Sequence, residues 1–331
     1  MTPGSSRPVA LRHRLQYSLL LALRECFRHL SPGVAIALGG VIGRLYARLG
    51  GPRTGDALVN LRIAFPNWSR GERRRVLEAC FANMGRSLAE VCLLQGRQRE
   101  VLLESVRIEG LEHYQAARAA STTGGVIVVT AHFGSWELCG AAIAHQGFPL
   151  SVVHHDLGNP YVEALVTSWR RSSGIGELVV GRAALGVLRA LRRGRIVAML
   201  LDQNAHPGEA VFAPFFSELA STRAAPAAMA MKRGFSVLPV FIFREGESWR
   251  HVVRIYPPIE MDRGSDDELE DQAALVRNVT RMNGAIESAI RGAPDHWMWP
   301  HRRWKTRPEG QSRHLYQRRG WRSGRGGKKP Q

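Results

Sequence analysis

The sequence predicts an α/β fold in which helices flank a largely parallel central sheet. Between residues 126 and 291, short apolar runs of strand length alternate with longer segments of helical periodicity, which is the pattern of strand–helix–strand units. The apolar runs are nearly continuous, as in strands covered on both faces. With 331 residues, 44% of them hydrophobic, the chain is long enough for one large domain or two modest ones.

The N-terminal segment predicts two helices. Apolar side chains recur every three or four positions from Leu15 to Leu30, while arginines lie off that line, which indicates a helix with an apolar stripe and a basic flank. A second apolar run at 34–43 is shorter than the roughly 20 residues of a spanning helix. No cleavable signal is recognised, because charges continue through the apolar part. The helices either belong to a soluble core or lie on a membrane surface, and the basic flank favours the membrane.

The rest of the chain divides into a helical region, an alternating region and a tail. Residues 54–119 are expected to be helical, with a break at 65–67. Predicted strands are 126–129, 150–153, 196–201, 237–243 and 251–255. Predicted helices are 136–145, 161–171, 183–193, 226–233 and 269–291. We therefore expect N-terminal membrane-associating helices at 1–53, a larger folded body at 54–310 and a basic Arg/Gly-rich tail without fixed structure at 311–331.

Charge is concentrated at the two ends. The net charge is +18, with eight arginines and one glutamate in residues 1–53, and eleven lysines and arginines and one glutamate in residues 301–331. The body between them is therefore nearly neutral. Basic flanks suit attachment to an anionic lipid surface, whereas a nucleic-acid enzyme would carry its charge across the working face. The four cysteines show no ligand spacing, which favours reduced thiols.

A candidate catalytic pair follows the first strong strand, where His132 and Glu137 flank Gly134. Five positions apart on one helix they would point about 140° away from each other, so they meet only if the chain turns between them. Gly134 permits such a turn. A histidine oriented by a carboxylate is a general base. The plain alternative is a packed His132 and a Glu137 that complements the helix dipole.

No protein nucleophile accompanies this pair. Ser135 lacks the surrounding glycines of a nucleophile elbow, and Cys139 lies further into the predicted helix. A base without a protein nucleophile indicates that the substrate supplies one, for instance a hydroxyl group. No metal site and no cofactor are expected.

The chain resembles the bacterial lipid A biosynthesis lauroyl/myristoyl acyltransferases, within the lysophospholipid acyltransferase superfamily. The histidine, four intervening residues and acidic residue of that family match 132–137, and the resemblance covers roughly residues 15–310. The other matching segments follow in the family's order: Asn60-Leu61, Phe65-Pro66, Asn83-Met84-Gly85-Arg86-Ser87, Asn159-Pro160, Asp202-Gln203-Asn204, Phe212-Ala213-Pro214-Phe215-Phe216 with Thr222, Pro239, and Trp299-Pro300-His301-Arg302-Arg303-Trp304-Lys305-Thr306-Arg307-Pro308.

The resemblance implies that the body at 54–310 is an acyltransferase domain with a glycerolipid acyltransferase-like fold. It implies transfer of a fatty acyl chain to a hydroxyl of a membrane glycolipid similar to a lipid A precursor. The co-substrate would be an acyl carrier protein thioester, and the place the cytoplasmic face of the inner membrane, with the protein peripheral or monotopic. His132 would deprotonate the hydroxyl and Glu137 would orient His132. Backbone N–H groups near Gly134 and an arginine would stabilise the oxyanion.

The chain departs from the family before Asn159-Pro160, where His155 stands in place of the usual arginine. Arg302 and Arg303 are the candidates to supply that charge. Asn159, Asp202 and Gln203 complete the expected substrate-binding set, together with Gly134, His155, Arg302 and Arg303.

Three alternatives remain open. The same chemistry would serve a lysophospholipid or a mannosylated inositol lipid as acceptor, or acyl-CoA as donor. An RNA-binding role would rest on the Arg/Gly tail and the pI of about 11.0. Because the body carries no RNA-binding signature, no nucleic-acid partner is expected.

Overall fold

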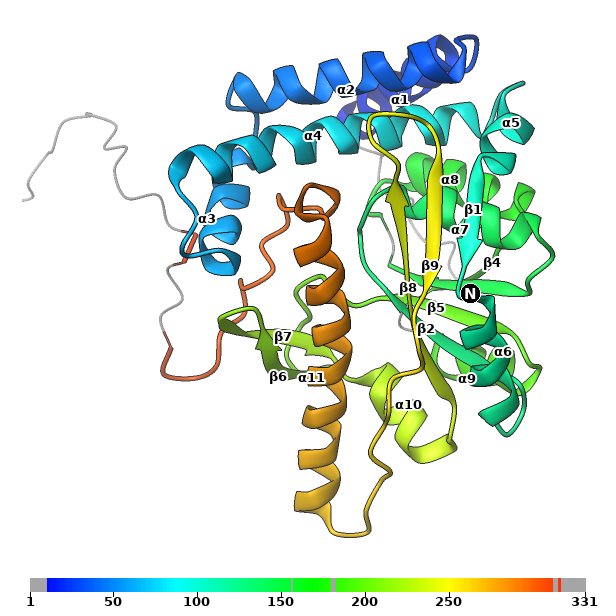
Figure 1. The fold of residues 1–331 in the computed structure, drawn as a ribbon, viewed down its shortest axis with the longest axis vertical. Coiled ribbons are helices and arrows are strands. Elements are labelled where there is room, and N and C mark those ends of the chain that lie inside the picture. Colours follow the sequence, from blue (N-terminus) through cyan, green and yellow to red (C-terminus); the bar gives the residue numbers. More distant parts are fainter. Residues whose placement is uncertain (1–10, 156, 180–182, 312–314, 317–331) are drawn as a thin grey trace, which may run out of the picture.

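A seven-stranded mixed sheet with helices on both faces organises the chain (Figure 1). The computed structural model describes residues 11–155, 157–179, 183–311 and 315–316. The strand order is β1-β9-β8-β2-β5-β3-β4, and a separate antiparallel hairpin joins β6 and β7. The strand bounds are β1 Val106–Glu109, β2 Val126–Thr130, β3 Leu150–His154, β4 Gly176–Val179, β5 Ile196–Leu200, β6 Ala210–Phe215, β7 Glu218–Arg223, β8 Ser236–Arg244 and β9 His251–Ile255.

The sheet is mostly parallel, as predicted. Its neighbours pair in parallel except β8 and β9, which form an antiparallel pair. The five predicted strands appear within one or two residues of their predicted bounds. The region 54–119 is not wholly helical, because β1 interrupts it. This short strand forms a parallel pair with β9.

Helices cover both faces of the sheet. Their bounds are α1 Leu11–Phe27, α2 Pro32–Arg48, α3 Thr54–Ala64, α4 Arg70–Leu93, α5 Arg99–Glu104, α6 Leu111–Ala120, α7 Trp136–His145, α8 Pro160–Ser172, α9 Ala183–Arg192, α10 Ala225–Arg233 and α11 Glu268–Gly292. One apolar core lies between the sheet and α9, α10 and α11, and a second lies between the sheet and α6 and α7. Residues alternate between these cores along each strand, which is the period-two geometry of a pleated sheet.

The N-terminal helices lie along α4 (Figure 1). Helix α2 approaches α4 so closely that a Cβ on Gly39 would stand 2.5 Å from the carbonyl oxygen of Gly85. Glycine is therefore required at this crossing, since any side chain would force the two helices apart. Among the residues described, no helix combines the length and the apolar character needed to cross a bilayer.

Candidate active site

His132 lies at the carboxyl edge of the sheet, two residues beyond the end of β2. The chain then turns at Gly134, whose φ is +57°, before α7 begins. A Cβ at this position would lie 2.4 Å from the carbonyl oxygen of Ile242. Both the left-handed backbone and the close approach require glycine. The predicted turn between His132 and Glu137 is therefore present.

Asp202 supplies the carboxylate that holds the His132 ring. Its Oδ1 lies 2.9 Å from Nδ1 of His132, and Nε1 of Trp297 donates to its Oδ2 at 2.8 Å. Burial by itself would raise the pKa of Asp202, but the His132 ring and the two hydrogen bonds outweigh burial and hold that pKa below its ordinary value. The group is therefore an ionised carboxylate at neutral pH.

This arrangement fixes the tautomer of the imidazole. An ionised carboxylate only accepts hydrogen bonds, so Nδ1 of His132 carries the proton that Asp202 accepts. In the neutral ring, Nε2 then keeps its lone pair and can take a proton from a substrate. The amide nitrogen of Gln203 stands 3.3 Å from Nε2, which places a polar group beside the atom where a hydroxyl would bind.

Glu137 has a different partner from the one predicted. Its Oε2 accepts from Nε of Arg170 at 3.1 Å, and its Oε1 accepts from the same guanidinium at 2.5 Å. The structure thus corrects the expected pairing: the carboxylate at Nδ1 of His132 is Asp202. Glu137 faces α8 because it lies in the first turn of α7, opposite the last turn of α8, where Arg170 lies. A catalytic role for Glu137 stays a prediction.

Gly134 and Asn159, which were also expected to bind substrate, form hydrogen bonds within the protein. The N–H of Gly134 donates to the carbonyl oxygen of His296 at 2.8 Å, so this N–H is already used. Asn159 caps α8 and donates to the carbonyl oxygen of His13 in α1 at 3.1 Å. Asn159 therefore has a structural part, joining α8 to α1.

Arg302 and Arg303, the two arginines expected to bind substrate, form hydrogen bonds within the protein. Nε of Arg302 donates to Asp56 at 2.9 Å. Arg303 is fully buried and donates to the carbonyl oxygens of Gln203 and Ser221, at 3.2 and 2.5 Å. Neither arginine lines the cavity described next. Arg303 thus holds the backbone of Gln203 by a hydrogen bond, and Gln203 lines the cavity.

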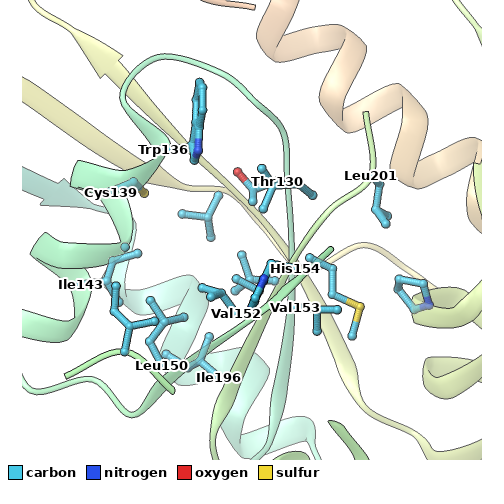
Figure 2. A pocket seen from close by; sticks show the side chains of 18 of the residues that line it. Thr130, Trp136, Cys139, Ile143, Leu150, Val152, Val153, His154, Ile196 and Leu201 are labelled. Carbon is cyan, nitrogen blue, oxygen red and sulfur yellow. The ribbon is translucent and has the colours of Figure 1, made fainter. Parts of the chain in front are cut away.

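His132 lines a cavity of about 720 Å³. Figure 2 shows other residues of its lining, among them Thr130 and His154. Its walls are mostly aliphatic and aromatic, and polar side chains gather near the carboxyl ends of β2, β3 and β5. This is the composition of a site for a large apolar ligand with a few orienting groups. The polar and charged side chains that line it are Thr130, His132, Glu137, His154, His155, Arg170, Gln203, Glu209 and Arg223.

Arg223 is a functional candidate that the sequence did not single out. Arg223 lines the cavity, Nε of its guanidinium is buried without a hydrogen-bond partner among the described residues, and Glu209 stands 3.9 Å away. Burial, followed by the charge of Arg223, lowers the pKa of His155, so His155 is neutral at pH 7. Of His155 and Arg223, therefore, only Arg223, at the end of β7, brings a positive charge to the cavity wall. A lone arginine in a strand carries no sequence signal.

No cysteine is poised to act as a nucleophile at this site. Cys139 lines the cavity, but burial raises the pKa of its thiol to about 12. A thiol with that pKa is protonated at neutral pH and is a poor nucleophile. Ser135 is 1% exposed and does not line the cavity. Neither side chain is therefore placed to act as a nucleophile in this cavity.

Comparison with known proteins identifies the family of the chain. The family model for bacterial lipid A biosynthesis acyltransferases matches residues 5–306. The chain is 30% identical over 278 residues to the lipid A biosynthesis lauroyltransferase of Escherichia coli K12, covering 84% of this chain and 87% of that protein. It is 31% identical over 277 residues to the palmitoleoyltransferase of the same organism (83% and 86%), and 27% identical over 272 residues to its myristoyltransferase (82% and 80%). The chain therefore belongs to the bacterial lipid A biosynthesis acyltransferase family and is an acyltransferase.

Proposed function

We propose that the protein transfers a fatty acyl chain from an acyl carrier protein thioester to a hydroxyl of a lipid A precursor, with His132 as general base. The observation that carries the proposal is the placement of His132. Its Nδ1 is held by the ionised Asp202, and its ring lines a largely apolar cavity. The base thus stands where an acyl chain and an acceptor hydroxyl would meet.

The reaction follows from this placement. Nε2 of His132 takes the proton of the acceptor hydroxyl, and the oxygen attacks the thioester carbonyl carbon. The tetrahedral intermediate then expels the thiolate, which takes the proton from the imidazolium and leaves as a thiol. Asp202 stabilises the imidazolium while it exists. An ester has formed and a thioester has broken, with no net change in protons.

The oxyanion of the intermediate needs hydrogen-bond donors. Because the N–H of Gly134 is occupied, we assign this role to the Gln203 amide and Arg223, which both line the cavity. Glu137 holds Arg170 on the opposite wall through two hydrogen bonds. In this proposal Glu137 acts on Arg170 and shapes the wall beside the base.

Membrane attachment forms the second part of the proposal. Large apolar side chains are exposed on α1 and α2, and they include Leu15 and Leu19 on α1 and Leu38 and Leu45 on α2. An apolar helix face accompanied by arginines is typical of a helix that lies in a membrane interface. Asn159, at the start of α8, donates a hydrogen bond directly to α1. We place the protein peripherally on the cytoplasmic face of the inner membrane, as the family resemblance implies.

A reconstituted transfer assay tests the chemistry. The purified protein is given acyl carrier protein thioester and a lipid A precursor, and the product ester is identified by mass spectrometry. We expect transfer by the unaltered protein and none by His132→Ala at equal thermal stability. Parallel reactions with acyl-CoA, a lysophospholipid and a mannosylated inositol lipid compare the other donors and acceptors. Transfer by folded His132→Ala would exclude the assigned base, and a faster reaction with another acceptor would replace the lipid A precursor.

Vesicle binding tests the attachment. Leu38→Ser/Leu45→Ser removes apolar side chains from the exposed face of α2, so we expect weaker co-sedimentation with vesicles containing anionic phospholipid. Leu269→Ser is the matched control, because Leu269 is 83% exposed on the distant helix α11. Equal binding by both variants would contradict docking through α2.

A further inference from the structure

The cavity at His132 has two lobes, one on each face of the sheet. Alternate residues along a strand face opposite ways, and the cavity is lined by both kinds. Ala198 of β5 belongs to the core that packs on α7. Its neighbour Met199 belongs to the core that packs on α9 and α10. The cavity therefore passes over the carboxyl edge of the sheet from one face to the other.

The first lobe lies between the sheet and helices α6 and α7. Cys139 and Ile143 of α7 line it, as do Tyr114 and Phe148. The rings of Tyr114 and Phe148 pack edge to face with centroids 5.2 Å apart, so they form an aromatic part of its wall. An apolar lobe of this kind suits a linear alkyl chain.

The second lobe lies on the opposite face, between the sheet and helices α9 and α10. Figure 2 shows Cys139 and Ile143 on one side of His154 and Leu201 on the other. Val187, Pro226 and Met229 add apolar walls to the Leu201 side. At the rim of this lobe stand Arg223 and Glu209. The second lobe thus combines an apolar interior with a charged rim, which fits an alkyl chain that carries a polar headgroup.

Two alkyl chains must lie close to one base when the acyl group of a thioester passes to a lipid. The reacting atoms have to come within about 3–3.5 Å of each other, while the two chains need separate space. His132, at the edge where the lobes join, meets both requirements, since the sheet itself separates the chains.

We propose that the second lobe, between the sheet and α9–α10, is a binding site for an alkyl chain of the acceptor lipid, while the first lobe takes the chain of the thioester donor. This inference rests on the proposed function. The rim of Arg223 and Glu209 assigns the acceptor to the second lobe, because the acceptor bears the larger polar headgroup.

Two matched substitutions test the assignment by chain-length profiles. Met229→Trp fills the second lobe and Ile143→Trp fills the first. We expect Met229→Trp to lower kcat/KM for a long-chain acceptor by about tenfold or more, to leave a short-chain acceptor near the unaltered value, and to keep the donor chain-length preference. Ile143→Trp should shift the donor preference to shorter chains and leave the acceptor profile unchanged. Both variants are compared with the unaltered protein for thermal stability.

Opposite outcomes would overturn the inference. A shift of the donor profile by Met229→Trp would show that the donor chain extends into both lobes. Unchanged profiles in a folded Met229→Trp would show that no chain enters the second lobe. If Met229→Trp does not fold, Met229→Ala, which widens the lobe, must instead favour longer acceptor chains, and an unchanged acceptor preference would overturn the inference.

Photo-cross-linking separates this inference from the proposed function. A lipid A precursor with a diazirine at the end of an acyl chain is irradiated with full-length His132→Ala, and the labelled peptide is mapped. We expect label in 225–233, whereas a diazirine acyl thioester should label 136–148. Label in 225–233 without transfer by the unaltered protein would support the lobe and reject the proposed reaction. Transfer with acceptor label only in 136–148 would reject the lobe assignment.

Discussion

Oδ1 of Asp202 lies 2.9 Å from Nδ1 of His132, although the two residues are 70 positions apart. The register of the sheet brings them together. Thr130 of β2 pairs with Leu200 of β5, and His132 and Asp202 each lie two residues beyond that pair. Neighbouring parallel strands therefore deliver the base and its carboxylate to one point on the carboxyl edge, where ligands bind in sheets of this class.

Replacing Asp202 by asparagine is expected to remove most of the activity. An amide no longer demands a proton on Nδ1 of His132, so the ring can adopt the tautomer in which Nε2 is protonated and cannot act as base. In a His–Asp pair of this kind such a change lowers kcat by about 10³-fold or more. Steady-state kinetics at saturating substrate measure the loss.

Trp297→Phe is the matched control for Asp202→Asn. It removes one hydrogen bond from Asp202 and leaves the carboxylate in place, so a much smaller loss of kcat is expected. A folded Asp202→Asn protein with nearly unaltered kcat would exclude Asp202 as the orienting group.

Glu137 and Arg170 are expected to be energetically coupled. Each of the variants Glu137→Gln and Arg170→Gln breaks the same close ion pair between partly buried groups, although Glu177 still stands 3.8 Å from Arg170, so the two losses in free energy of unfolding should not add. The coupling energy of a double-mutant cycle is expected to be about 1 kcal/mol or more. Urea denaturation of the four proteins measures it.

Arg171→Gln replaces Arg170→Gln in the control cycle, because the Arg171 side chain is 76% exposed and points away from the cavity wall. We expect its effect to add to that of Glu137→Gln. If both cycles were additive, the pairing of Glu137 with Arg170 would carry no energetic weight.

Arg223 is expected to replace the arginine that the family carries at the position of His155. Arg223→Gln should lower kcat/KM by about 10–100-fold, since it removes a cation from the cavity wall. Adding His155→Arg to that variant should restore part of the loss, because a guanidinium returns to the same wall. Kinetics of the single and double variants decide this, with Arg189→Gln as an exposed control. No recovery in the folded double variant would argue against interchange of the two positions.

His301 is expected to make the free energy of unfolding depend on pH. Its Nε2 accepts the N–H of Asn204 at 3.0 Å, which requires a neutral ring, and burial lowers the pKa of His301 to about 4. Between about pH 6.5 and 4 the unfolded chain thus binds more protons at this residue than the folded one. The free energy of unfolding should fall with decreasing pH there by up to about 1.4 kcal/mol per unit.

His301→Gln supplies the comparison, since the glutamine does not titrate. Urea denaturation of both proteins between pH 7 and 5 should give a shallower pH dependence for the variant. Parallel pH profiles would show that His301 does not contribute.

The regular elements of the sheet could be predicted because their patterns are local. The apolar run ending at Thr130 and the helix beginning at Trp136 are bounded by residues within a few positions. The strand β1 was missed because four residues with one buried side chain carry almost no period; only pairing with β9 explains it. The hairpin of β6 and β7 likewise depends on pairing between segments.

The site was predicted in part, and the missing part is long-range. His132 and Gln203 were singled out and both line the cavity. The partner of His132 was assigned to the nearest carboxylate in the sequence, Glu137, whereas register between strands selects Asp202. Trp297, which donates to Asp202, is 1% exposed and is therefore packed in the interior. Most of the tail, 311–331, lies outside the described residues.

The segment that follows α11 supports the candidate site from behind. Trp297 donates to the carboxylate of Asp202, and Arg303 donates to the backbone carbonyl of Gln203. Asp202 and Gln203 in turn both contact the ring of His132. Substitutions in this segment would therefore alter the surroundings of His132 indirectly, without changing any residue of the sheet.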